Sequence, residues 1–255
     1  MKFPFSIHIG EQNIILHGIF EFIGIFVAYR YYLWLKRKQG DPIAYEHRLF
    51  VITGAALGAV LGARIIGSLE NLPAWRAAHS FWLYFYGNKT LVGGLLGGLA
   101  GVELMKKLIG ERQNTGDLFT MPLIAGMIIG RFGCFSAGVY EETYGFPSKL
   151  PWAMNLGDGI YRHPVTLYEI LFLILLWVLL ANLRKRDVLV QGSLFKLFLI
   201  VYLIFRFFLD FIKPGWRFFG GLGTIQLACL AGLLYYYRFI IDPRLLFNSK
   251  QKYAR

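Results

Sequence analysis

The chain has 255 residues, of which 56% are hydrophobic and 17% aromatic, and its formal net charge is +12. A water-soluble globular domain is usually about 45–50% apolar, so this composition favours a protein that lies largely in lipid. The positive charge does not indicate a nucleic-acid-binding protein, because Lys and Arg gather in alternate connections between apolar segments.

Seven apolar segments follow one another along the chain, and each is close to the roughly 20 residues that a helix needs to cross a bilayer. Nothing between them is long enough to form a second folded domain. We therefore predict an all-α polytopic membrane protein of about seven transmembrane helices, organised as a single transmembrane domain over residues 1–255. The predicted spans are residues 14–35, 49–69, 91–109, 118–139, 164–183, 193–212 and 222–241.

The distribution of basic residues predicts the orientation of these spans. Lys and Arg gather in residues 36–48, 106–112 and 184–186 and in the tail from residue 238. Because Lys and Arg mark cytoplasmic loops, we expect the N-terminus outside and the C-terminus in the cytoplasm. The first residues do not show the pattern of a removable signal peptide, so the first apolar segment is expected to stay as a span. We expect a multi-pass protein of the bacterial plasma (inner) membrane.

The two longer connections on the predicted outer face, residues 70–90 and 140–163, are rich in Trp and Tyr. Aromatic rings favour the membrane–water boundary, so a simple interfacial belt explains any single ring. Two such loops on one face also fit a platform where something docks from outside.

Glycine recurs inside the predicted spans at spacings that bring helices together. Gly54, Gly58 and Gly62 lie four residues apart, and Gly93 and Gly94 open a glycine-rich third span. Small residues at this spacing let helix backbones approach closely in lipid. Tight helix packing is therefore the expected role of most of them.

Ionisable residues inside the spans are the most informative feature for function. An arginine at the bilayer centre costs about 2.5–3.5 kcal/mol on insertion scales, so such residues usually face a polar interior. Arg30 and Glu103 lie near cytoplasmic helix ends, where they are expected to reach the interface. Arg64, Arg131 and Arg206 fall in the outer halves of three different spans. We predict that these three arginines converge in one outward-opening cavity.

A planar, permanently charged guanidinium suits bidentate recognition of phosphate, and phospholipids are the phosphates available to a membrane site. Three glycines near Arg131 would let a ligand or another backbone come close. Arg206 and Asp210 are spaced i,i+4 and can pair on one helix face, so a purely structural ion pair is the alternative for them.

His163 precedes a predicted helix start at Pro164, and Glu169 lies about a turn and a half further on. A histidine that titrates near neutral pH beside a buried glutamate is able to relay protons. A hydrogen-bonding role at the helix start is the other interpretation of His163.

Cys134 and Cys229 both fall in apolar segments and show neither a disulfide framework nor the spacing of metal ligands. Cys134 lies three residues after Arg131. It is either packing, as buried cysteine usually is, or a nucleophile that carries an acyl group.

Together, the ordered motifs resemble the prolipoprotein diacylglyceryl transferase family over nearly the whole chain. They are Gly130–Gly138, Tyr144-Gly145 through Ala153, the run HPVTLYE at 163–169, and Phe205-Arg206 followed by Asp210, Pro214 and Gln226. The resemblance implies transfer of a diacylglyceryl group from phosphatidylglycerol to the lipobox cysteine of a prolipoprotein signal peptide, with release of glycerol phosphate. It implies lipoprotein biosynthesis as the process, with these substrates and membrane lipids as partners and no nucleic acid.

On the matching positions, the resemblance implies that Arg131 and Arg206 handle the phosphate and that Gly145 is a required glycine. No cofactor is expected. The candidate catalytic residues are Arg131, Arg206, His163 and Glu169, the candidate substrate-binding residues are Arg64, Gly133, Gly138, Gly145, Asp210, Gln226, Gly93 and Gly94, and no metal ligand is expected.

The chain departs from the family pattern in the half of the site that would receive the acceptor. Val92 stands before the paired glycines of the third span, where family members carry histidine. An early tyrosine of the first span is missing, and His17-Gly18-Ile19 occupies that region. Cys134 and Ala137 replace asparagines, and Glu141 or Glu142 takes the place of an expected glutamate. If the missing histidine is the base, then His163, Glu169 or no residue serves here.

Three functions remain under consideration. The first is the transfer that the resemblance implies, with arginines stabilising the leaving phosphate. The second is a divergent transferase that moves a phospholipid group to another acceptor. The third is a membrane protein that binds or transports lipid without catalysis, in which the arginines only hold a head group.

Overall fold

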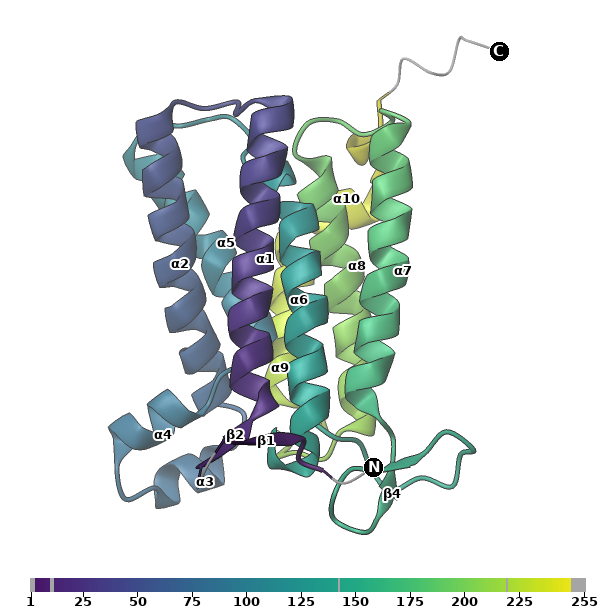
Figure 1. Ribbon diagram of the computed structural model, residues 1–255. Helices are drawn as coiled ribbons and strands as arrows, with labels where there is room; N and C mark the ends of the chain where they lie inside the picture. The colour runs from purple at the N-terminus through teal and green to yellow at the C-terminus, as the bar shows by residue number, and fades with distance from the viewer. Residues whose placement is uncertain (1–2, 10–11, 142, 219, 249–255) are drawn as a thin grey trace.

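The computed structural model describes residues 3–9, 12–141, 143–218 and 220–248. All seven predicted segments are helical, and the helices run side by side in one bundle (Figure 1). The chain is therefore an all-α polytopic membrane protein, as predicted. The seven helices are α1 (Leu16–Gln39), α2 (Tyr45–Ser68), α5 (Leu91–Leu108), α6 (Asp117–Ala137), α7 (Val165–Lys185), α8 (Ser193–Leu209) and α9 (Thr224–Tyr235).

Four helices of the described chain, α1, α2, α7 and α6 with the turn that follows it, are long and apolar enough to cross a membrane. Large apolar side chains on them point outward, such as Phe22, Leu57 and Leu171, which are exposed by more than half. The helices α5, α8 and α9 have 18, 17 and 12 residues. The last predicted segment is interrupted at Tyr236 and continues as α10 (Tyr237–Ile241). The number of complete spans therefore stays a prediction.

Glycine lets α2 and α5 pack in near contact, as the sequence indicates. A Cβ atom built on Gly58 would lie 2.2 Å from the carbonyl oxygen of Gly97, and one on Gly93 would lie 2.4 Å from that of Gly62. No side chain fits at these distances, so the glycines are required by the close approach of the two backbones. The pair α1 and α6 crosses in a similar way, at Gly24.

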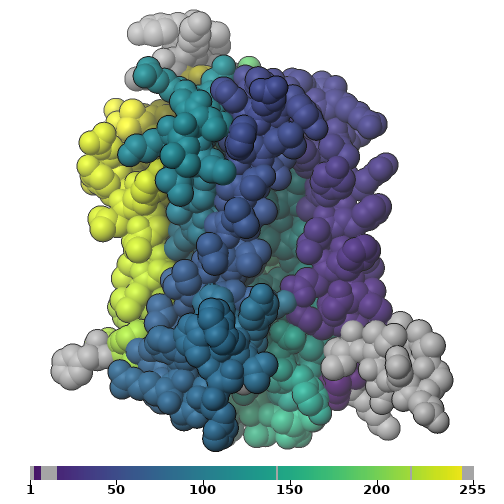
Figure 2. Space-filling model, turned by 90° about the vertical axis from the view of Figure 1, so that its left-hand side faces the viewer, coloured from purple at the N-terminus to yellow at the C-terminus, as the bar shows by residue number. Residues whose placement is uncertain are grey.

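The loops that were expected on the outer face gather at one end of the bundle (Figure 1). There the N-terminal arm forms a hairpin of β1 (Ser6–Ile9) and β2 (Gln12–Ile15). The loop at 70–90 holds α3 (Leu72–Ala77) and α4 (Phe81–Gly87), which cover the lower end of the face made by α2 (Figure 2). The loop at 140–163 follows the 3₁₀ turn η1 (Gly138–Glu141) and holds β3 (Met154–Asn155) and β4 (Tyr161–Arg162).

The starts of α3, α4 and α5 are fixed by side-chain caps. Asn71, Ser80 and Thr90 each accept a hydrogen bond from the backbone N–H three residues on. Such a cap satisfies a donor that the helix cannot pair internally. At the opposite end of the bundle lie α10 and the 3₁₀ turn η3 (Pro243–Leu246) (Figure 1).

The densest part of the core lies between α7 and α8. Leu173, Phe198, Leu199 and Leu203 have no exposed surface. Tyr202 is equally buried within this apolar core, yet carries a hydroxyl group. A buried hydroxyl requires a hydrogen-bond partner. The partner of Tyr202 is Glu169, which lies beneath the cavity at the end of the bundle that carries the loops.

Candidate active site

A cavity of about 830 Å³ opens at the end of the bundle where the aromatic loops gather. This volume is in the range of small-molecule sites. Side chains from α1, α2, α5, α6 and α8 line it, together with residues of the connecting loops. Among the described residues that line it, five are basic and two acidic, so the cavity attracts anions. The charged lining residues are Arg64, Lys89, Arg131, Arg206, Lys213, Glu70 and Glu141.

Glu169 holds two of the arginines together beneath this cavity. Its Oε2 lies 3.0 Å from Nε of Arg131 and 3.9 Å from Nη1 of Arg206. Its Oε1 accepts a hydrogen bond of 2.6 Å from the hydroxyl of Tyr202. All four side chains are buried. One carboxylate between two guanidinium groups leaves one positive charge uncompensated, so the cluster is prepared for an additional anion.

Donors of both arginines remain available after these contacts. Nε of Arg206 is buried and has no hydrogen-bond partner among the described residues. Nη1 of Arg131 lies 3.6 Å from Sγ of Cys134. Arg64 lines the same cavity and donates a hydrogen bond from Nη1 to the backbone carbonyl oxygen of Tyr86. Its guanidinium also lies over the aromatic ring of Tyr86. The three arginines that were predicted to converge therefore do share one cavity.

Lys213 is a lining residue whose place in the cavity sequence reasoning missed. It follows the 3₁₀ turn η2 (Asp210–Ile212), and only 5% of its surface is exposed. Burial lowers the pKa of Lys213, and the nearby Arg206 lowers it further. In the sequence Lys213 looks like an ordinary basic residue of an outer loop, and no local pattern distinguishes it.

The ion pair between Arg206 and Asp210, considered as a structural alternative, does not form. The carboxylate of Asp210 instead lies 3.5 Å from Nη1 of Arg217, whose Nη2 donates 2.6 Å to the backbone carbonyl of Asp210. The helical spacing is kept, since the backbone N–H of Asp210 still donates to the carbonyl oxygen of Arg206, but the two side chains have other partners: Arg206 faces Glu169 on α7. Arg217 was not a candidate.

Gln226 is fully buried at the start of α9 and binds the same arginine. Its Oε1 accepts hydrogen bonds from Nη1 of Arg217, at 2.5 Å, and from the backbone N–H of Gly223, at 2.8 Å. Its Nε2 donates to the carbonyl oxygen of Phe207. Every one of these contacts is to the protein, so Gln226 and Asp210 hold Arg217 and the wall of the cavity in place.

The structure does not bring His163 into contact with Glu169, so of the two interpretations of His163 it does not support the proton relay. Nδ1 of His163 lies 3.2 Å from the hydroxyl of Tyr168, which also accepts a hydrogen bond of 2.8 Å from Nε1 of Trp152. These residues belong to the outer loop and the first turns of α7. Glu169 points to the arginines instead, and its pairing makes it a counter-ion rather than a free base.

The glycines that were predicted to bind substrate are close-packing positions in the structure, with one exception. A Cβ on Gly133 would lie 3.0 Å from the carbonyl oxygen of His17, and one on Gly145 would lie 2.5 Å from Cβ of His163. Gly138 adopts a φ of +63°, and a Cβ there would meet a backbone oxygen at 2.2 Å.

The paired glycines of α5 differ from each other. Gly93 faces the backbone of α2, whereas a Cβ on Gly94 would make only ordinary contacts, at 3.7 Å. Neither is among the lining residues, but the preceding Val92 is, and it is fully buried.

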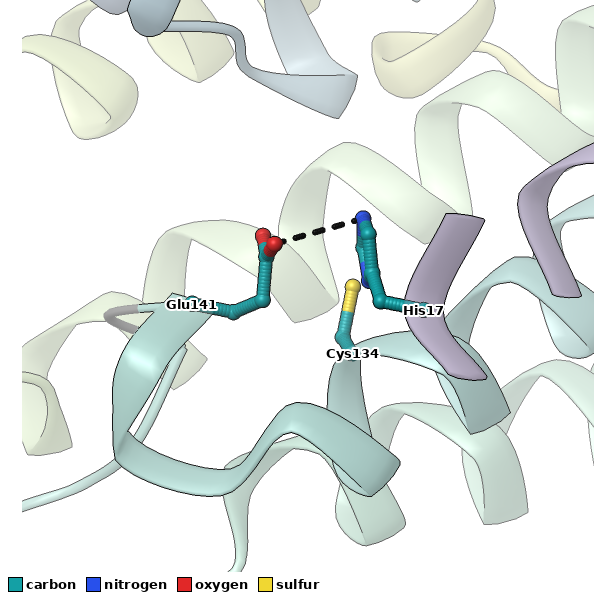
Figure 3. Close-up of side chains that lie close together, drawn as sticks. All are labelled: His17, Cys134 and Glu141. Carbon is teal, nitrogen blue, oxygen red and sulfur yellow. Dashed lines mark ion pairs between the residues drawn. The ribbon is translucent and has the colours of Figure 1, made fainter. Parts of the chain in front are cut away.

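A second cluster of side chains, which the sequence did not predict, lies next to Arg131. Its three members are drawn in Figure 3. His17, Cys134 and Glu141 come from α1, α6 and η1, and their polar atoms all lie within 4.8 Å of one another. Nε2 of His17 is 3.4 Å from Oε1 of Glu141. The spacing of cysteine and histidine along the sequence gave no metal or catalytic pattern, because three separate elements supply the three groups. Glu142, the other glutamate considered for this region, lies outside the described residues.

Comparison with known proteins gives the family. The family model described as prolipoprotein diacylglyceryl transferase matches residues 4–241. The chain is 33% identical to the phosphatidylglycerol–prolipoprotein diacylglyceryl transferase of Nitratidesulfovibrio vulgaris, covering 89% of this chain and 88% of the relative. It is 31% identical to the protein of the same name from Bordetella avium, covering 85% and 84%. This protein is therefore a member of the prolipoprotein diacylglyceryl transferase family and a membrane transferase.

Proposed function

We propose that the arginine cavity binds the phosphate of phosphatidylglycerol and that the protein transfers the diacylglyceryl group to the lipobox cysteine of a prolipoprotein. The observation that carries the proposal is the Glu169 cluster, in which Arg131 and Arg206 share one carboxylate and keep one positive charge in excess. The names of the relatives supply the substrates. The loops at 70–90 and 140–163 would then face the outside of the bacterial inner membrane.

The reaction needs little more than positioning and charge. A thiolate of the acceptor forms a bond to the terminal glycerol carbon of the diacylglyceryl group, and the bond from that carbon to the phosphate oxygen breaks. Glycerol phosphate leaves with the electron pair, and negative charge increases on its oxygen as the bond breaks. Guanidinium groups that are already in place stabilise this charge without reorganisation, which is the usual source of a large rate effect. Lys213 adds a further positive charge to the same cavity.

A divergent acceptor is the second candidate, and one observation favours it. Val92 lines the cavity, fully buried, at the position where the resemblance implies a histidine. The thiol of Cys134, with the imidazole of His17 and the carboxylate of Glu141 near it, lies next to Arg131. The residues that would bind the phosphate therefore keep the pattern that the resemblance implies, whereas those that would receive the acceptor do not.

The test is reconstitution of the purified protein in vesicles that contain phosphatidylglycerol, with a synthetic lipobox peptide as acceptor. We expect a diacylglyceryl thioether on the peptide and one glycerol phosphate for each transfer. Arg206→Ala is expected to lower the rate about 10²–10³-fold, the effect of removing one preorganised donor to a developing charge. Arg162→Ala is the matched control, because Arg162 pairs with Asp158 in the outer loop and does not line the cavity.

The acceptor is tested in the same assay with a peptide whose cysteine is replaced by serine. Loss of glycerol phosphate release with this peptide supports the lipobox thiol as acceptor. Equal release with and without the thiol supports the divergent acceptor. Phosphatidylglycerol that stays bound to the purified protein without any turnover would leave only a lipid-binding function and reject the proposal.

A further inference from the structure

Three chemically reactive side chains from separate elements meet at one place. His17 lies in the first turn of α1, Cys134 lies near the end of α6, and Glu141 lies on η1. We call these three residues the thiol cluster. Figure 3 shows the carboxylate of Glu141 on one side of the His17 ring and Sγ of Cys134 beside the ring. The order thiol, imidazole, carboxylate is the order in which a nucleophile, its base and the residue that orients the base are arranged.

The thiol cluster is built into the fold. Both ring nitrogens of His17 are buried, and within the described residues the closest carboxylates to Nε2 are those of Glu141, at 3.4 Å, and Glu21, at 3.8 Å, so no backbone group holds the ring in a purely structural role. Gly133 lets the first turn of α1 pack directly on α6, since a Cβ there would lie 2.9 Å from Cβ of Phe20. This contact brings His17 to Cys134.

Charged groups surround the thiol cluster on every side. Nη1 of Arg131 on α6 lies 3.6 Å from Sγ of Cys134. Glu21 on α1 approaches Nε2 of His17 to 3.8 Å and pairs with Lys89, which precedes α5, at 2.5 Å. A guanidinium beside a sulfur stabilises a thiolate, the reactive form of cysteine. His17, Arg131 and Glu141 all line the cavity, and Cys134 lies directly behind them, so a lipid bound there is next to the thiol cluster.

We propose that Cys134 is a nucleophile that takes a fatty acyl group, as a thioester, from an ester-linked glycerolipid bound in the arginine cavity. The thiolate of Cys134 forms a bond to the ester carbonyl carbon, and the bond from that carbon to the glycerol oxygen breaks. The glycerol oxygen leaves with the electron pair and takes the proton that His17 removed from the thiol. Glu141 is a positioning residue that orients the imidazole. Water, or the hydroxyl or amine of an acceptor, then attacks the thioester, and His17 takes its proton.

The two carbons that Cys134 could attack give products of very different reactivity, and this difference selects the acyl carbon. Attack of Cys134 on the glycerol carbon next to the phosphate would give a thioether, whose carbon–sulfur bonds do not break under mild conditions, and the protein would be blocked after one event. A thioester passes its acyl group on readily. The ester carbonyls of a phospholipid also lie only a few bonds from the phosphate, so a phosphate on Arg131 brings them close to Cys134.

The same three residues are a set of potential metal ligands, and the geometry argues against that role. A bound metal would use a single nitrogen of His17 and would have the positive guanidinium of Arg131 next to its sulfur ligand. A cation beside a cation is unfavourable in a low-dielectric site. A thiolate beside Arg131 and an imidazole beside Glu141 give each charge an opposite partner.

This activity rests on the lipid-binding part of the proposed function but not on transfer to a lipobox thiol. The two are separated with two kinds of vesicle. Phosphatidylglycerol with ester-linked, alkyne-tagged acyl chains supports both reactions. Phosphatidylglycerol with ether-linked chains keeps the phosphate and the glycerol carbon but has no acyl group. It therefore supports head-group displacement and forms no thioester.

The experiment incubates the full-length protein in each vesicle and detects acylated protein by tag fluorescence and by mass spectrometry of the peptide that contains Cys134. We expect label from the ester lipid only, release of the label by neutral hydroxylamine, and at least one lysolipid for each label. Cys134→Ser is expected to abolish the label. Cys229→Ser is the matched control, because Cys229 is the other cysteine of the chain, is buried in α9, and is not part of the thiol cluster.

Two further variants test the proposed roles. His17→Gln is expected to lower the labelling rate about 10²-fold, which is the lower end of the usual contribution of a general base. Glu141→Gln is expected to move the pH profile of labelling toward lower pH, because without the nearby negative charge the imidazole and the thiol both lose their protons more easily. A merely structural Glu141 would change the amount of folded protein but not the pH profile.

The proposal is overturned by any of four results with folded wild-type protein. They are no label at Cys134 from the ester lipid, a label that hydroxylamine does not release, a label that persists in Cys134→Ser, and one equivalent of zinc that Cys134→Ser loses. Thioether transfer from the ether lipid without any thioester from the ester lipid leaves the proposed function intact and rejects this inference. A thioester from the ester lipid without any release of glycerol phosphate supports this inference and rejects the proposed transfer to a lipobox thiol.

Discussion

At the scale of single residues, Glu169 is the centre on which the cavity depends. It is 1% exposed and faces two guanidinium groups and one tyrosine hydroxyl. Removing one partner of a buried ion pair leaves an uncompensated charge in a medium that solvates it poorly. Glu169 therefore contributes to stability and to the position of the arginines, rather than to proton transfer.

Replacing Glu169 by Gln is expected to lower the free energy of unfolding by about 3–5 kcal/mol, because Arg131 and Arg206 lose their shared counter-ion. Thermal or chemical unfolding in detergent measures the change. The matched control is Asp158→Asn in the exposed pair with Arg162, where we expect a change of about 1 kcal/mol or less. Equal effects of the two substitutions would contradict the role of Glu169.

Lys213 gives the cavity a pH dependence on the alkaline side. Burial and the charge of Arg206 lower its pKa, while Glu70 and Asp210 act in the opposite direction and Arg131 adds to the lowering. As the pH rises through this lowered pKa, Lys213 loses its positive charge, and the affinity for an anionic head group should decrease. This decrease should occur at a lower pH than the one at which an ordinary lysine titrates. Binding of ether-linked phosphatidylglycerol across the pH range measures this.

The control for this prediction is Lys213→Arg, which keeps the positive charge at all accessible pH values. The alkaline decrease in affinity should disappear in that variant. A wild-type affinity that stays constant to the pH where free lysine titrates would show that Lys213 does not act on the bound phosphate.

At the scale of secondary-structure elements, the crossing of α2 and α5 fixes one wall of the cavity. The glycines of both helices let the backbones touch at Gly58 and Gly97 and at Gly62 and Gly93. The crossing positions Arg64 on α2 and Val92 on α5 at the same cavity.

The neighbouring glycines of α5 provide a matched pair of substitutions. Gly93→Ala would place a Cβ 2.4 Å from the backbone oxygen of Gly62, so we expect a loss of about 1–3 kcal/mol from overpacking. Gly94→Ala would place its Cβ 3.7 Å from the nearest atom and is expected to be neutral or slightly stabilising. Melting temperatures of the two variants in the same detergent measure the difference. Equal destabilisation by both would contradict the packing.

Long, apolar elements could be predicted from the sequence, and irregular ones could not. All seven helices begin within a few residues of their predicted segments, because lipid demands long runs of apolar residues. The break at Tyr236 and the β1–β2 hairpin carry no such signal. The partner of Asp210 could not be predicted, because Arg217 reaches it from the loop after η2 while Arg206 faces Glu169 on another helix.

The candidate site was predictable to the extent that its charges lie in apolar surroundings. Arg131 and Arg206 were found because a charge in a span is costly and therefore conspicuous. His17, Cys134 and Glu141 were not found as a group, because α1, α6 and η1 bring them together over long sequence separations. Each residue alone has an ordinary structural explanation.

At the scale of the whole molecule, the β1–β2 hairpin near the start of the chain lies at the cavity end of the bundle, and α10, near the end of the chain, lies toward the opposite end (Figure 1). This arrangement fits an odd number of spans. The distribution of Lys and Arg predicts that the cavity end faces outward.

The orientation is tested with single cysteines introduced into a Cys134→Ser, Cys229→Ser background. Asp158→Cys in the loop at the cavity end should react with an impermeant maleimide in intact spheroplasts. Arg112→Cys between α5 and α6 should react only after the membrane is permeabilised. The reverse pattern would place the cavity on the cytoplasmic side and remove access from outside.

The central claim is that two buried arginines from α6 and α8 hold one lipid phosphate. A structure of the protein in a lipid nanodisc with ether-linked phosphatidylglycerol, which resists acyl transfer, tests it most directly. We predict phosphate oxygens within hydrogen-bond distance of both Arg131 and Arg206, with Glu169 still between the two guanidinium groups. A head group bound elsewhere, or arginines that stay paired only with Glu169 while the lipid occupies the cavity, would contradict the account.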